Sequence, residues 1–107
     1  MSNPTTVIAQ QPLRALTVAN ERRTATALLK SRLRRGEVTL AAVLADPPAE
    51  TGRVLTFEVL LWAPQFGHWR LRVLNSRAMR YGYVNLATSL GELTDRQRQW
   101  LAGEIRR

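Results

Sequence analysis

The chain has 107 residues, enough for one small domain with a modest hydrophobic core. It contains no cysteine, which excludes a disulfide framework, a thiol nucleophile and a cysteine-based zinc site. Sixteen basic residues stand against eight acidic ones, and a domain with a net charge of +8 most often binds nucleic acid. No apolar run is long enough to span a bilayer and no secretory signal is visible, so we expect a cytoplasmic protein without a membrane partner.

Residues 1–12 differ in composition from the rest of the chain. They include Pro4 and Pro12 among polar residues and show no helical period. Such a segment is predicted to be a flexible tail. Residues 13–107 then form the predicted domain, in which no internal repeat is visible.

Residues 13–35 contain neither glycine nor proline and predict one long amphipathic helix. At 100° per residue, its apolar side gathers Val18, Ala25, Leu28, Leu29 and Leu33. Arg23, Lys30 and Arg34 fall nearly opposite that side, which gives the helix a basic face. Gly36 is expected to end the helix in a left-handed conformation.

Two short helices are predicted next. Thr39 is a candidate cap for Leu40–Ala45, whose leucine and valine side chains would pack inward, and Pro47 follows as a stop. Thr56 is a candidate cap for a helix over residues 57–62, which Pro64 ends.

The C-terminal part of the chain predicts two further helices. One covers residues 69–80, with Gly82 placed as its left-handed terminator. After a loop over residues 83–93, Thr94 and Gln97 form a capping box that opens the last helix. The expected buried face of this last helix consists of Trp100, Leu101 and Ile105.

These patterns favour an all-α fold. Short apolar runs are ambiguous, so strands within residues 38–44 or 54–61 stay an alternative.

The stretch APQFGHWRLR joins two predicted helices through Pro64 and Gly67. Backbone amides around such a glycine lie at the N-terminus of the next helix, where an anion is favoured. His68, Arg70, Arg72 and Arg77 follow and can add positive charge. The hairpin is therefore a candidate phosphate site, although many helical hairpins use this spacing only to turn.

Three segments, in order, resemble the actinobacterial integration host factor family. Residues 20–46 are similar to its basic helix, glycine and short helix ending in a valine-leucine and acidic turn. Residues 60–75 are similar to its Leu-Pro-x-x-Gly-Lys hairpin and following helix, and residues 89–105 to its Leu-Gly, polar, terminal-helix ending.

The resemblance implies a long N-terminal helix packed on a small helix-two-turns-helix domain. It also implies a non-enzymatic, nucleoid-associated protein that binds double-stranded DNA with little sequence preference and bends or compacts it. The hairpin match falls on Pro64 and Gly67. The matching cations of the first helix are Arg22, Arg23, Lys30, Arg34 and Arg35.

Two departures from the family pattern stand out. His68 takes the place of the usual lysine, and residues 84–89 (VNLATS) contain none of the arginines that the family has there. The chain therefore resembles a divergent member, of the kind that a phage or another mobile element encodes. A surface of apolar and small residues in place of charge also supports an alternative function, a protein-interaction module that engages a host recombinase or nucleoid protein.

Other candidate sites are weaker. His68 is the only histidine and has no partners at ligand spacing, and no nucleophile–base set is visible, so we expect no metal, no cofactor and no enzyme activity. The three tryptophans, Trp62, Trp69 and Trp100, are expected in the core, and Tyr81 and Tyr83 as packing residues with hydroxyls at the surface. The DNA-binding protein is expected to be a monomer.

Overall fold

The computed structural model describes residues 4–64 and 66–106, and this part of the chain is mostly helical, with loops between the helices. Its elements are α1 (Pro4–Arg35), α2 (Leu40–Ala45), α3 (Thr56–Trp62), α4 (His68–Arg77), the π-helical turn η1 (Ala78–Gly82), the 3₁₀ turn η2 (Leu90–Glu92) and α5 (Asp95–Arg106). The predicted all-α class is confirmed. The alternative of strands is wrong, because extended pairing in the described residues is limited to an isolated bridge between Leu55 and Ser89.

The first helix begins at Pro4, earlier than the predicted start at residue 13. A proline suits the first turn of a helix, where its missing N–H has no intrahelical partner. Pro12 lies inside the helix and removes one backbone donor there without ending it. Residues 1–3 lie outside the described residues, and the flexibility predicted for residues 1–12 stays a prediction.

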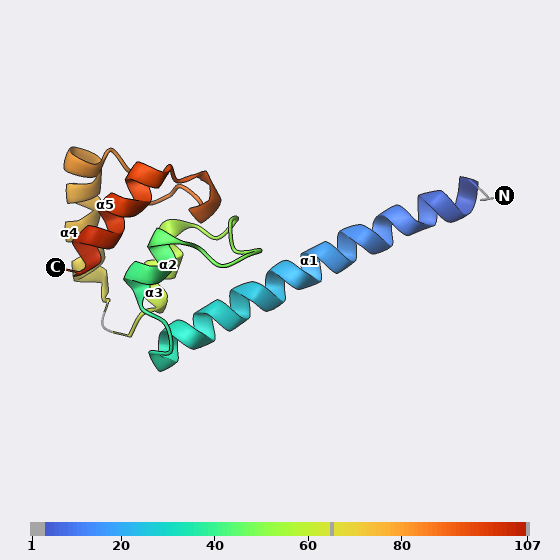
Figure 1. Cartoon of the computed structure of the whole chain (residues 1–107), viewed down its shortest axis with the longest axis horizontal. Coiled ribbons are helices and arrows are strands. Elements are labelled where there is room, and N and C mark those ends of the chain that lie inside the picture. The colour runs from blue at the N-terminus through green and yellow to red at the C-terminus, as the bar shows by residue number, and fades with distance from the viewer. Residues whose placement is uncertain (1–3, 65, 107) are drawn as a thin grey trace.

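Most of α1 projects from the globular part of the molecule (Figure 1). The principal extents are 60 × 29 × 20 Å, and a 32-residue helix is about 48 Å long. Only the C-terminal part of α1 packs on the domain, through Leu29 and Leu33, which are 3% and 2% exposed. The expected burial of Val18 and Leu28 is wrong. Val18 lies ahead of the part of α1 that packs on the domain, whereas Leu28 lies beside the buried Leu29 but faces about 100° away from it.

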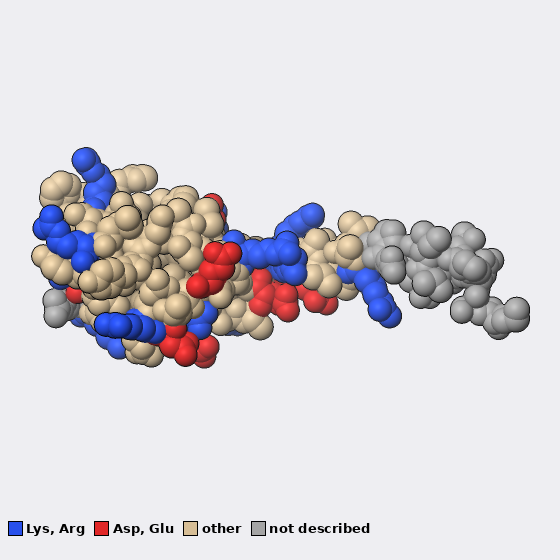
Figure 2. All heavy atoms as spheres, turned by 90° about the horizontal axis from the view of Figure 1, so that it is seen from above, with Lys and Arg blue, Asp and Glu red and all other residues tan. Residues whose placement is uncertain are grey.

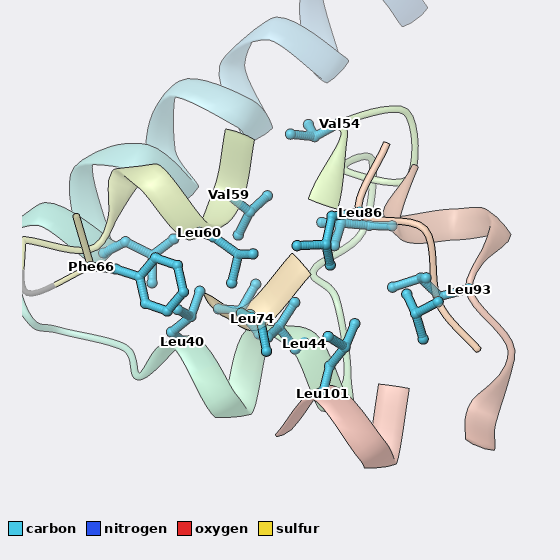
Figure 3. Packing of buried hydrophobic residues seen from close by; sticks show 14 of the residues in the cluster. Leu40, Leu44, Val54, Val59, Leu60, Phe66, Leu74, Leu86, Leu93 and Leu101 are labelled. Atoms are coloured by element: carbon cyan, nitrogen blue, oxygen red, sulfur yellow. The ribbon is translucent and has the colours of Figure 1, made fainter. Parts of the chain in front are cut away.

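The remaining helices enclose one core (Figure 3). Leu44 of α2, Leu60 of α3 and Leu101 of α5 are fully buried at its centre. Leu74 of α4 and Ala78 of η1 are also buried and attach α4 to the same core. The predicted inward packing of α2 is therefore confirmed.

Several predicted helix ends are confirmed. Gly36 follows α1 with a φ of +72°. The Thr39 hydroxyl accepts the Ala42 N–H at 3.2 Å. In the capping box, the Thr94 N–H donates to Gln97 Oε1 at 2.9 Å, and the Gln97 N–H donates to Thr94 Oγ1 at 3.2 Å.

Two other predicted ends are wrong. Thr56 is the first residue of α3 rather than its cap, and its hydroxyl donates to the Thr88 carbonyl at 2.7 Å. The left-handed residue after η1 is Tyr83, with a φ of 52°, and not Gly82. Gly82 instead allows a close contact, since a Cβ there would lie 2.6 Å from ring carbons of Trp100.

Candidate nucleic-acid interface

Three cations line one flank of α1, and we call Arg23, Lys30 and Arg34 the α1 stripe. At 100° per residue, they fall within about 40° of one another around the helix axis. None of them forms an ion pair with another described residue, whereas other cations of the chain do. Figure 2 shows Lys and Arg side chains along α1 and over the globular part. The three stripe cations therefore lie beyond ion-pair distance of every acid in the described part of the chain, although Figure 2 also shows Asp and Glu side chains beside α1.

The other two predicted cations of α1 are partly neutralised. Arg22 Nε lies 4.0 Å from Glu50 Oε2 on the loop after α2. Arg35 Nη1 lies 3.3 Å from Glu37 Oε1, and its Nη2 donates to Ser31 Oγ at 2.6 Å. The basic face of α1 is therefore narrower than the sequence predicted.

Lys30 connects the α1 stripe to the hairpin. It is half-buried, and its Nζ lies 5.8 Å from the centroid of the Trp62 ring. Trp62 is the last residue of α3, so the chain enters the Pro64–Gly67 hairpin directly after this contact. The fold thus brings together the two basic regions that the sequence predicted separately.

The hairpin ends at Gly67, which is the N-cap of α4. Among the described residues no side chain caps this helix, and its first turn contains no acid. Its first N–H groups thus have no side-chain acceptor among the described residues, and the phosphate contact expected there stays a prediction. Gly67 has an ordinary φ of −90°, and a Cβ there would meet nothing within 4 Å, so the fold itself does not require glycine at this position.

A groove of about 540 Å³ lies between the end of α1 and the hairpin. The Arg70 guanidinium lies in its wall, 5.1 Å from the centroid of the Phe66 ring. The lining residues include Leu33, Gly36, Thr39, Pro64, Phe66 and Arg106. Apolar walls with two arginines give this groove a positive character.

Arg77, another predicted DNA contact, forms an ion pair with Glu104 of α5. Its Nε donates to Glu104 Oε2 at 2.9 Å and its Nη2 to Glu104 Oε1 at 3.3 Å. The hydrogen bonds and the charge of Glu104 raise the pKa of Arg77 above its ordinary value. Because its charge is compensated, a phosphate contact by Arg77 is disfavoured and stays a prediction.

The expected burial of the aromatic residues is only partly correct. Trp62 and Trp100 are half-buried and pack against the core. Trp69 is 76% exposed, and Tyr81 and Tyr83 are 55% and 78% exposed. The expectation that these three side chains pack in the interior is therefore wrong. The signal was present in the helical period, because Trp69 lies about 140° around α4 from the buried Leu74.

The loop over residues 84–89 does not present an apolar surface. Val84 and Leu86 are buried, and the Phe57 N–H donates to the Leu86 carbonyl at 3.0 Å. The apolar part of the surface expected here is thus wrong, whereas the small residues Ala87, Thr88 and Ser89 do lie at least partly exposed. A recombinase or nucleoid-protein partner stays a prediction.

The described residues contain no group of three or more His, Cys, Asp or Glu side chains that could hold a metal ion. Among them, no helix is both long enough and apolar enough to cross a membrane. No protein-family model, curated protein or solved structure matches this chain.

Proposed function

We propose that this protein is a non-enzymatic, architectural DNA-binding protein that contacts the backbone of duplex DNA with low sequence specificity. The observation that carries the proposal is the α1 stripe, whose charge has no counter-ion among the described residues and which adjoins the hairpin. Binding of these cations to phosphates would release the condensed counter-ions of the duplex, which drives association.

The hairpin supplies a second, weaker contact. The free N–H groups at the start of α4 and the guanidinium of Arg70 can approach a phosphate from the same side as the groove. Contacts of this kind position a duplex without reading its bases. Specificity would then arise from the shape and deformability of the DNA rather than from base edges.

The resemblance to actinobacterial integration host factors supports the same function. From the resemblance we also propose a cytoplasmic, nucleoid-associated location and a monomeric state. For a divergent member, it further implies an origin in a phage or another mobile element. The free stripe cations and the hairpin are the parts of the family pattern that this chain retains.

The test is the binding of a labelled duplex of about 25 base pairs by fluorescence anisotropy, for Arg34→Glu and Arg32→Glu. Both residues are exposed, lie near the end of α1 and change the net charge equally, but Arg32 lies about 160° around the helix from Arg34. We expect Arg34→Glu to weaken binding about tenfold and Arg32→Glu by less than threefold. Equal losses in the two variants, or no duplex binding at low salt, would overturn the proposal.

A further inference from the structure

Large apolar side chains are exposed along one segment of the fold. The exposed fractions are 76% for Trp69, 43% for Val73, 56% for Met79, 55% for Tyr81 and 78% for Tyr83. Neither the core nor the α1 stripe uses these side chains. Exposed apolar residues that gather in this way mark a binding surface.

The spacing of these residues places several of them in one row. Trp69, Val73, Arg77 and Tyr81 follow one another at intervals of four, which makes them neighbours along a helix surface. We call this row the aromatic ridge. Its two aromatic residues are separated along the axis by about 18 Å, at 1.5 Å per residue.

A row of polar and basic residues runs beside it. His68, Arg72, Ser76 and Arg80 also follow at intervals of four, and all are exposed. We call this row the basic ridge. No acidic residue occurs in the chain between Glu58 and Glu92, and Glu104 of α5, which faces this region, is bound to Arg77. The surface is therefore positive as well as aromatic.

The ring of Tyr81 is restrained by the guanidinium of Arg77. The Arg77 guanidinium lies 5.3 Å from the centroid of the Tyr81 ring, and Glu104 fixes that guanidinium from the other side. A cation over one face of the ring restrains it by a cation–π interaction. The exposed part of the ring remains accessible to a ligand.

We propose that the aromatic and basic ridges bind single-stranded nucleic acid. Unpaired bases stack on Trp69 and Tyr81, and Arg72 and Arg80 contact the phosphates. Base–aromatic stacking beside a positively charged track is the general chemistry of single-strand binding, and it tolerates any sequence. The axial separation of these two residues, about 18 Å, corresponds to roughly five stacked nucleotides at 3.4 Å each. At 100° per residue, a strand that contacts both rings would also follow the helix surface through about 120°.

An unpaired strand fits this surface better than a duplex does. In a duplex the faces of the bases are covered by their neighbours, so an exposed indole has no base face to stack on. The absence of acids on the ridges favours a polyanion, and the arginines beside the rings match a chain that alternates bases and phosphates. This site is separate from the α1 stripe. Its basic ridge begins at His68 in the first turn of α4, where it adjoins the hairpin contact that we propose for duplex DNA.

The experiment measures binding of a labelled 15-mer oligothymidylate and of a matched duplex to the full chain and to two variants. Trp69→Phe keeps an aromatic face, whereas Trp69→Leu keeps apolar area without one. Because Trp69 is largely exposed, both variants are expected to fold, which circular dichroism checks. We expect Trp69→Leu to weaken oligothymidylate binding about tenfold, Trp69→Phe by less than threefold, and duplex binding to change in neither.

Unchanged oligothymidylate binding by Trp69→Leu would overturn the inference, and so would failure of the full chain to bind oligothymidylate at low salt. The duplex measurements with Arg34→Glu test the proposed function separately, so the two ideas can fail independently.

Discussion

The α1 stripe and the basic ridge of α4 carry the same sign of charge but differ in what lies beside it. The stripe cations are neighbours of small side chains such as Ala27, and its aromatic contact, Trp62, lies half-buried beneath Lys30. The basic ridge instead runs next to the exposed Trp69 and Tyr81. If both proposals hold, the difference teaches that net charge selects a polyanion as ligand, while the residues between the charges decide which form of it binds.

The largest expected difference between the two surfaces is in how steeply salt weakens the affinity of their ligands. If about six phosphates contact the stripe and hairpin, the slope of log K against log salt is near −5, and a rise from 50 to 200 mM weakens duplex binding roughly a thousandfold. With about three phosphates on the basic ridge, the slope for oligothymidylate is near −2 and the loss about twentyfold. Anisotropy titrations at four salt concentrations measure both slopes. Identical slopes would remove the distinction between the surfaces.

Truncating the side chain that docks α1 on the core should lower the stability of the fold. Leu29 is 3% exposed and Leu28 is 48% exposed, so Leu29→Ala is expected to lower the free energy of unfolding by about 2–5 kcal/mol and Leu28→Ala by less than about 1 kcal/mol. Urea denaturation followed by circular dichroism gives both values. A similar effect of the two substitutions would contradict the packing of α1 on α3.

Removing the carboxylate of Glu58 should raise the affinity for duplex DNA slightly and leave single-strand binding unchanged. Glu58 is exposed on α3, one turn before Trp62, and forms no ion pair with another described residue. We expect Glu58→Gln to strengthen duplex binding about twofold to threefold at low salt and to leave oligothymidylate binding unchanged. A gain that persists at high salt would mean that the acid acts through the fold and not through its charge.

Local signals in the sequence predicted the helix ends well. The signals that succeeded act on residues at most a few positions away, so the local sequence is enough to predict them. They are Gly36, Thr39 and the pair Thr94 and Gln97. The proximity of the α1 stripe to the hairpin could not be predicted in this way. It depends on the contact between Lys30 and Trp62, which are far apart in the sequence.

Errors arose where tertiary packing overrides local preference. Gly82 was expected to supply a left-handed turn, but the ring of Trp100 occupies the space beside it and Tyr83 takes the positive φ. Trp69 was expected in the core because tryptophan is usually buried, yet Leu74 and Ala78 already occupy the side of α4 that faces the core. Whether an aromatic residue is buried depends on the helix face that it occupies. The helical period of α4 already predicts that Trp69 faces away from the core.

If the protein binds duplex DNA as proposed, the projecting part of α1 limits how densely copies can bind along it. The residues of α1 before Ala25 extend for roughly 30 Å at 1.5 Å per residue, close to the 34 Å of one turn of the duplex. A molecule seated by its stripe would shield about one further turn with this rod. Fewer copies would then saturate a long duplex than the globular part alone would allow, and neighbouring copies would be kept apart by a fixed spacer.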